Sequence, residues 1–285
     1  MVLMIIAVLI IVGLCLGSFV NALVWRVHEQ ARQGHEGKKK PDKAYSERLS
    51  ISKGRSMCPH CKHELASKDL VPVLSWLALR GKCRYCHKPI SIQYPLVELA
   101  AAALFVASYI WWPAVFTPTQ TALFVLWLGL LTGLLALLVY DVRWLLLPDL
   151  ILYPAGGLAA ALAAVSIITA DKPLVSLGST VLAVLVGGGA FYLMFQISDG
   201  KWIGGGDAKL GFVLGLAAGT PARSFLFIFL ASIAGSLVSL PLVATHRLKK
   251  TSLIPFGPFL IAGLIAVQLF GPDMFHWYRQ TFINY

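Results

Sequence analysis

The sequence predicts an all-α polytopic membrane protein, with about eight transmembrane helices and a cytoplasmic zinc-binding loop domain between the first two. Three observations predict this class. The chain has 285 residues, 58% of them hydrophobic, and a mean hydropathy of +0.75, which is unlike a water-soluble protein. Apolar runs of about 20 residues, the length that spans a bilayer as a helix, recur along the chain. One polar loop with four cysteines separates the first two runs.

The apolar runs give the order of the expected helices. The sixth run is short and follows three glycines, which is typical of a broken helix that lines a cavity. The first run is followed, not preceded, by basic residues, so it predicts a retained span rather than a signal peptide. The chain then divides into a first transmembrane helix (1–25), a loop domain (26–95) and a multi-helix membrane domain (96–285). We expect spans at 2–25, 96–116, 121–140, 150–169, 174–195, 207–220, 224–243 and 252–270.

The distribution of basic residues predicts the orientation. With eight alternating spans and the loop 26–95 in the cytoplasm, 21 of the 24 Lys and Arg residues lie inside. Only Lys172, Arg223 and Arg279 lie outside. Positive residues favour the cytoplasmic side, so we expect both termini outside and the loop inside. Contact between the basic loop and anionic membrane lipid explains the net charge of +11, and no nucleic acid is expected as a partner.

Two Cys-x-x-Cys pairs in this loop predict a metal site. Each pair places two thiolates on one tight turn, and two such turns build the tetrahedral site that zinc prefers. Disulfides are the competing interpretation, but they are rare in the reducing cytoplasm. Three histidines are alternative ligands that a complete set of cysteines makes unnecessary: His60, His63 and His87. We therefore expect a structural zinc on Cys58, Cys61, Cys83 and Cys86.

Two acids predict a catalytic site at the membrane. Asp207 follows Gly204, Gly205 and Gly206 at the start of the sixth run, and Asp141 lies at the cytoplasmic end of the third. An acid at membrane depth is costly and therefore indicates function. The alternative for Asp207 is a glycine turn in which it caps the next helix. Two carboxyl groups in one site cannot both ionise easily, so one can activate a water while its protonated partner polarises a carbonyl. The pair thus predicts general acid–base hydrolysis of a peptide bond.

Other interpretations of the acids stay open. Asp149, directly after Pro148, is typical of a helix N-cap, yet it is the best rival to Asp141 as the partner of Asp207. Glu98 is explained as a first-turn acid that complements the helix dipole. A transporter can also carry paired membrane acids, although the zinc loop and the lack of a repeated half disfavour one. A non-catalytic assembly scaffold would use the zinc loop and need neither acid.

Eight groups of residues, in a fixed order along the chain, match the motifs of a known family. They are 17–21 with Arg26, the two cysteine pairs, 69–76, 89–91, 94–98, Asp141 with 148–149, 204–210 and 255–258. In these groups the chain resembles the bacterial type IV prepilin peptidases, membrane aspartic proteases of the Gly-x-Gly-Asp type. The resemblance covers nearly the whole chain, except the basic stretch 31–50. It implies that Asp141 and Asp207 are the catalytic aspartates and that 96–285 is the peptidase domain.

The resemblance also implies an activity. Such enzymes of the bacterial inner membrane cleave the leader from type IV prepilins or type II secretion pseudopilins at the cytoplasmic face, and both termini would lie in the periplasm. Many members methylate the new N-terminal residue with S-adenosylmethionine, an activity that the family ties to the zinc loop. The sequence contains no glycine-rich fingerprint for the methyl donor, so its binding residues are unknown. A peptidase without methylation is the alternative.

Overall fold

The computed structural model describes residues 1–35, 47–51, 54–245 and 255–282. These residues form helices and loops with no β-strand, apart from two isolated β-bridges, Met57 with Glu64 and Lys82 with Pro89. The predicted all-α class is therefore confirmed. The chain folds as two compact units, Met1–Ile110 and Trp111–Tyr285, each of which has its own helices. The finer division at residues 25 and 95 stays a prediction.

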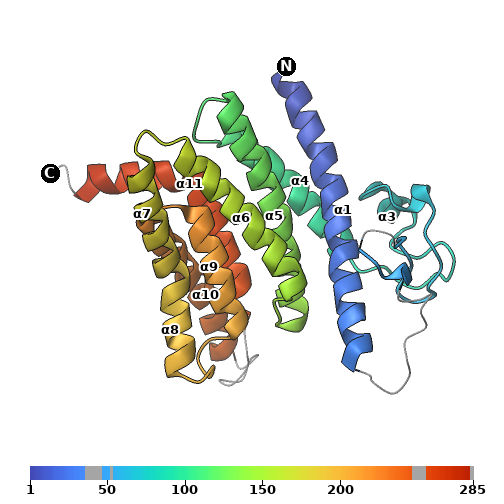
Figure 1. The fold of residues 1–285 in the computed structure, drawn as a ribbon. Helices are drawn as coiled ribbons and strands as arrows, with labels where there is room; N and C mark the ends of the chain where they lie inside the picture. The colour runs from blue at the N-terminus through green and yellow to red at the C-terminus, as the bar shows by residue number, and fades with distance from the viewer. Residues whose placement is uncertain (36–46, 52–53, 246–254, 283–285) are drawn as a thin grey trace. The chain divides into compact units, whose positions relative to one another are not determined.

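Helices α1 (Val2–His35) and α4 (Gln93–Ile110) pack along each other in the first unit (Figure 1). Glycines let the two backbones approach closely. A Cβ at Gly17 would lie 2.6 Å from the Cα of Glu98, and one at Gly13 would lie 2.6 Å from the Cα of Ala102. Small residues at such contacts are typical of helix pairs in membranes. The loop between the two helices carries the 3₁₀ turn η1 (Ser67–Asp69) and helix α3 (Leu74–Ala78).

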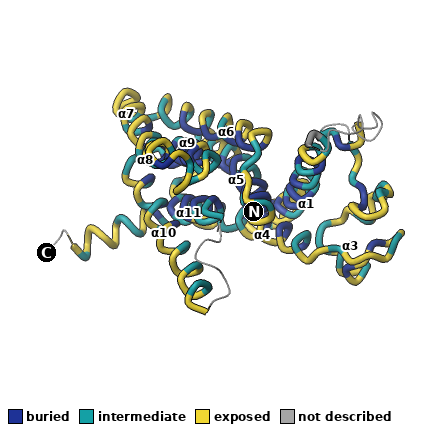
Figure 2. Tube along the Cα trace, turned by 90° about the horizontal axis from the view of Figure 1, so that it is seen from below, coloured by how far each residue is buried: buried dark blue, intermediate teal, exposed yellow. Residues whose placement is uncertain are grey.

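The second unit is a bundle in which the short helix α9 is surrounded by others (Figure 1). The burial pattern places much of α9 inside the unit (Figure 2). The helix α7 continues through a π-helical turn, η2, into α8, and glycines bring that turn close to α9. A Cβ at Gly187 would lie 3.0 Å from the Cα of Gly215. The helices of this unit are α5 (Pro118–Trp144), α6 (Asp149–Ile168), α7 (Pro173–Val184), η2 (Leu185–Gly189), α8 (Ala190–Ile197), α9 (Gly205–Ala218), α10 (Pro221–Ala244) and α11 (Gly257–Phe282).

Seven helices of the described chain are long and apolar enough to cross a membrane. They correspond to seven of the eight predicted spans, so the chain is a multi-pass membrane protein. The eighth, 207–220, is α9, which has 14 residues. At 1.5 Å per residue it is about 21 Å long, shorter than the roughly 30 Å of hydrocarbon in a bilayer. This agrees with a short helix held inside the bundle. The seven are Val2–Gln33, Gln93–Ile110, Pro118–Trp144, Asp149–Ile168, Pro173–Ile197, Pro221–Ala244 and Gly257–Phe282.

Candidate active site and metal centre

Asp207 lies in the first turn of α9, directly after three glycines that form the start of this helix. Gly204 is the extended N-cap residue, so Asp207 is the third residue of the helix, with its carboxyl beside the backbone N–H of Gly204. An acid at this position complements the helix dipole. Gly206 faces Leu147, where a Cβ would already lie 3.2 Å from that of Leu147. The glycines therefore let the start of α9 pack against the segment between α5 and α6.

Asp141 lies in the last turn of α5 and is only 5% exposed. The helix stops soon after it, because Leu145 adopts a left-handed conformation and donates its N–H to the Asp141 backbone oxygen at 2.8 Å. The side-chain Oδ2 accepts no hydrogen bond of good geometry from the described residues. Its neighbour is the backbone of Gly257 at the start of α11, where a Cβ would lie 2.6 Å from Oδ2. A side chain at position 257 would displace the carboxyl group of Asp141.

The fold brings the two acids together. The carboxyl groups of Asp141 and Asp207 are close enough to interact electrostatically. One comes from the C-terminal end of α5 and the other from the N-terminal end of α9, so they share one end of the bundle. A pair of neighbouring carboxyl groups, one of them buried and lacking a hydrogen bond, can divide the roles of acid and base. Such an arrangement is able to activate water and polarise a carbonyl group.

Asp149 has a different partner. Its carboxylate accepts hydrogen bonds from Lys209 Nζ at 2.8 and 2.9 Å, and both side chains are about half exposed. The Lys209 ammonium also lies 5.8 Å from the ring centre of Tyr153. The N-cap interpretation of Asp149 is wrong by one position, because Pro148 is the N-cap and Asp149 is the first residue of α6. The ion pair with Lys209 thus accounts for Asp149 better than a pairing with Asp207.

The four loop cysteines form one cluster. Their Sγ atoms all lie within 4.8 Å of one another, and those of Cys58 and Cys86 are 3.8 Å apart. That separation matches the edge of a tetrahedron with zinc–sulfur bonds of about 2.3 Å. It is far longer than the roughly 2.0 Å of a disulfide, and all four thiols are free. The cluster contains no histidine. These residues therefore fit a tetrahedral metal ion.

The surroundings of the cluster affect its thiols unequally. Burial raises the pKa of the Cys58 thiol to about 12. Burial also opposes ionisation of Cys83, but N–H groups of Cys86 and Tyr85 and neighbouring thiols outweigh it and lower the pKa of Cys83 to about 7. The Cys83 thiol is therefore more acidic than the Cys58 thiol. A metal ion that binds all four sulfurs has to displace their protons.

Asp69, the last residue of η1, binds two residues of the second cysteine pair's turn. It accepts hydrogen bonds from Arg84 Nε at 2.7 Å and from the Tyr85 hydroxyl at 3.1 Å. Burial on its own would raise the pKa of Asp69, but these two donors outweigh it and hold the pKa below its usual value. The Tyr85 ring also contacts His63, with ring centres 3.7 Å apart. His63 thus has a packing role beside the cysteine cluster.

Glu98 corrects a prediction. The helix α4 begins at Gln93, so Glu98 lies in its second turn, and the interpretation as a first-turn acid is wrong. The side chain is buried, lies beside the Ser18 hydroxyl and accepts a hydrogen bond from the Val73 N–H at 2.7 Å. Val73 has a φ of +61°, which is costly for a β-branched residue. Glu98 therefore holds a strained turn of the loop against α1 and α4.

Arg26 is a second buried link, and its backbone partners were not predicted from the sequence. Its guanidinium donates to three backbone oxygens, those of Ser50 and Ile51 at 3.2 Å and that of Gly54 at 2.9 Å. The fork of donors on an arginine suits several carbonyl groups at once. The only sequence signal was a basic residue directly after an apolar run, which does not reveal a backbone partner. Arg26 ties the loop to α1.

Two family models match the chain. The Bacterial Peptidase A24 N-terminal domain covers residues 11–112, and the Type IV leader peptidase family covers residues 128–240. A prepilin leader peptidase/N-methyltransferase of Burkholderia pseudomallei (strain K96243) is 34% identical over 93% of this chain and 85% of that protein. One of Aeromonas hydrophila is 33% identical over 95% and 92% of the two chains. No solved structure matches.

The fold and the two clusters define a polytopic membrane protein with an acid pair, one member of which is buried, and a four-cysteine loop. A third relative, a type 4 prepilin-like proteins leader peptide-processing enzyme of Escherichia coli O78:H11, is 34% identical over 89% of this chain and 90% of that protein. Similarity of this extent and level identifies the family. The chain belongs to the type IV leader peptidase family.

Proposed function

We propose that this protein cleaves the leader peptide of type IV prepilins or type II secretion pseudopilins, with Asp141 and Asp207 as the catalytic pair. The observation that carries the proposal is the buried Asp141 beside Asp207 in a chain of the leader peptidase family. The relatives are named for the same activity. The ion pair of Asp149 with Lys209 supports this choice of acids over the rival one.

The chemistry requires one ionised and one protonated carboxyl group. The carboxylate takes a proton from a water molecule as the water oxygen attacks the carbonyl carbon of the scissile bond. The protonated acid donates its proton to the carbonyl oxygen, which gives a tetrahedral diol. Collapse of the diol then breaks the C–N bond. The acid that took the proton from water donates it to the departing amine nitrogen, while one diol hydroxyl returns its proton to the other carboxylate, which restores the starting protonation states. No covalent intermediate with the protein forms.

A second activity follows on the same product. The new N-terminal amine would attack the methyl group of S-adenosylmethionine, so that an N–C bond forms, the S–C bond breaks and the amine loses a proton. Support comes from the names of the relatives, which include N-methyltransferase. The residues that bind the methyl donor are not assigned. A peptidase without methylation is the alternative.

The metal and the orientation belong to the same proposal. The four cysteines would hold a structural zinc, which would stabilise a loop that has few other buried groups. The protein would lie in the bacterial inner membrane, in contact with its lipid, with the loop in the cytoplasm and both termini in the periplasm. The support for this orientation is the excess of basic residues on the assigned inner side.

One experiment tests both activities. The purified protein in detergent is incubated with a prepilin, with and without S-adenosylmethionine, and the products are weighed by mass spectrometry. We expect a leader and a mature chain in both cases, and a mature chain heavier by one methyl group when the donor is present. Cleavage without the added methyl group would show that the protein is a peptidase and does not methylate its product. Absence of cleavage would overturn the proposal, and loss of ion flux in the acid variants would favour a transporter instead.

A further inference from the structure

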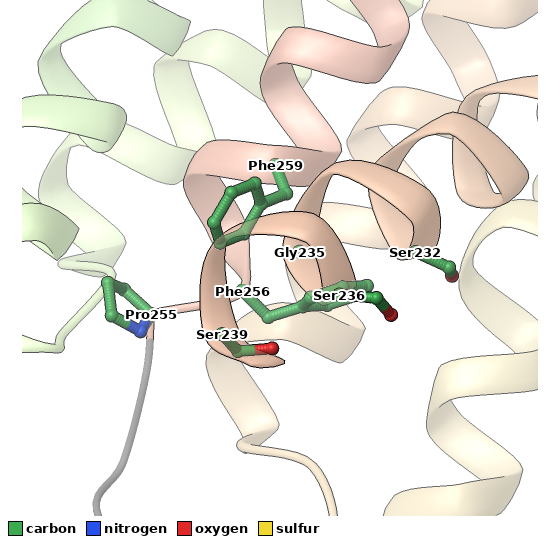
Figure 3. Close-up of a pocket in the computed structure, with 7 residues that line it drawn as sticks. All are labelled: Ser232, Gly235, Ser236, Ser239, Pro255, Phe256 and Phe259. Atoms are coloured by element: carbon green, nitrogen blue, oxygen red, sulfur yellow. The ribbon is translucent and has the colours of Figure 1, made fainter. Parts of the chain in front are cut away.

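A cavity of about 340 Å³ opens between α10 and the start of α11 (Figure 3). The α10 wall has only small residues, and the facing wall has two aromatic rings, Phe256 and Phe259. This volume is at the lower end of the range for ligand pockets and is enough for one or two large side chains. The small residues are Ser232, Gly235, Ser236 and Ser239.

One lining residue of the cavity is the chain neighbour of the glycine that lies against Asp141. Phe256 is followed directly by Gly257, the glycine whose backbone meets Asp141 Oδ2. Asp141 is 5% exposed, and its Oδ2 has no hydrogen-bond partner among the described residues. A peptide whose scissile bond lies at this carboxyl group must place the neighbouring residues against the adjoining surfaces. The cavity is one of those surfaces.

The lining favours a peptide segment over a purely hydrocarbon ligand. The Ser232 hydroxyl is satisfied, since it donates to the Ile228 backbone oxygen at 2.8 Å. Ser236 is exposed and Ser239 is half-buried, so both side chains on this wall are accessible to a ligand. A peptide carbonyl can accept hydrogen bonds from such hydroxyls, whereas a hydrocarbon chain cannot. Gly235 allows a backbone to approach, as small residues do between helices in membranes.

We propose that this α10–α11 cavity binds the apolar segment of the substrate that adjoins the scissile bond. The inference rests on the proposed peptidase function and deepens it by naming the substrate-binding surface. Large apolar side chains of the substrate enter between Gly235 and the two rings. The serine hydroxyls on the same wall bind backbone oxygens of the segment. Ser236 and Gly235 are therefore specificity-determining positions rather than catalytic residues.

Photo-cross-linking tests occupancy without requiring turnover. A benzoylphenylalanine is placed at Ser236 in the Asp207→Asn variant, and a matched probe is placed at the next residue, Leu237, which is 69% exposed. Prepilin in detergent micelles with added phospholipid is the ligand. We expect the probe at position 236 to cross-link to the apolar segment of the prepilin, and the probe at 237 to do so far more weakly. Cross-links from position 236 to lipid alone would overturn the inference.

Filling the cavity tests specificity. A Cβ at Gly235 would lie 3.6 Å from Phe259 and 3.8 Å from Phe256, so the rest of a leucine side chain would occupy the cavity. Gly157→Leu is the control, because a Cβ at Gly157 meets nothing within 4 Å. We expect Gly235→Leu to raise KM for prepilin about tenfold or more, and alanine in place of the large apolar residues next to the scissile bond to reduce that penalty.

The outcomes separate this inference from the proposed function. If the unmodified protein cleaves prepilin while Gly235→Leu behaves like Gly157→Leu and position 236 gives no cross-link, the cavity is not the binding surface and the peptidase function stands. If the unmodified protein does not cleave, the proposed function fails, and the cross-link alone decides whether the cavity binds the peptide. The cross-linking result holds even if Gly235→Leu does not fold.

Discussion

Asp141 and Asp207 have different surroundings although they belong to one proposed pair. Asp141 is buried at the end of α5, whereas Asp207 is partly buried in the first turn of α9, beside the Gly204 N–H. Water activation and carbonyl polarisation need different protonation states, so neither acid can replace the other. The size of each carboxyl group also fixes where the water is held.

Replacing either acid should remove leader cleavage. Asn keeps the size of Asp but can neither act as an ionised base nor share the proton. We expect Asp141→Asn and Asp207→Asn each to lower kcat for prepilin by about a hundredfold or more. The double variant should lose little beyond either single change, because residues that act as a unit are not additive. Asp→Glu should also nearly abolish cleavage, since the longer side chain misplaces the water.

Asp149→Asn is the matched control. Its ion pair with Lys209 is half exposed, and such pairs contribute about 1 kcal/mol or less. We expect this variant to keep most of the cleavage rate, measured with the same prepilin. An inactive Asp149→Asn together with an active Asp141→Asn would show that the pairing is wrong and that Asp149 acts with Asp207.

Glu98 offers a test of how the loop is held. Glu98→Ala would leave the partly buried Val73 N–H without its acceptor, and we expect the free energy of unfolding to fall by about 1–3 kcal/mol. Glu98→Gln should cost less, because an amide oxygen can still accept that hydrogen bond. Thermal unfolding of the purified protein in detergent measures both. Glu64→Gln, which loses a 3.6 Å exposed ion pair with Arg55, should cause almost no change. An equal effect at Glu64 and Glu98 would contradict this role of Glu98.

At the scale of elements, we expect the loop between α1 and α4 to depend on its cysteine cluster for stability. Metal analysis of the purified protein should find about one zinc per chain, as a closed four-thiolate site requires. Cys58→Ser combined with Cys83→Ser should release the metal and make the loop sensitive to proteases, because metal binding supplies folding energy. Leader cleavage should suffer less, since the proposed acids belong to other helices. Zinc that remained at full occupancy in the double variant would refute the assignment.

At the scale of the whole molecule, the charge distribution predicts orientation. Ala31, exposed near the end of α1, should lie in the cytoplasm, and Asp171, exposed between α6 and α7, should lie outside. In intact cells, a membrane-impermeant thiol reagent should label Asp171→Cys and leave Ala31→Cys unlabelled relative to the unmodified chain. Permeabilised cells should allow labelling at both positions. Efficient labelling of Ala31→Cys in intact cells would overturn the topology.

The sequence by itself determined the class of protein and most of its elements. Hydropathy and charge are properties of contiguous residues, so seven spans and the short α9 were predictable without a partner surface. The four cysteines were predictable as one set because paired Cys-x-x-Cys spacing is local. The proximity of Asp141 and Asp207 was also predictable, since acids in apolar runs are rare and the assigned topology places these two at one level. Their catalytic role stays a prediction.

Only the tertiary structure decided which residues meet. Lys209 pairs with Asp149 across 60 positions of sequence, and Glu98 accepts from Val73 across 25. The approach of Gly257 to Asp141 and the cavity between α10 and α11 likewise depend on how separate helices pack. A hydropathy pattern shows that a helix has an apolar surface. Because the faces of a membrane helix that contact lipid and those that contact other helices are both apolar, the pattern does not predict which helices pack together. Close backbone contacts and buried polar groups determine which helices pack together.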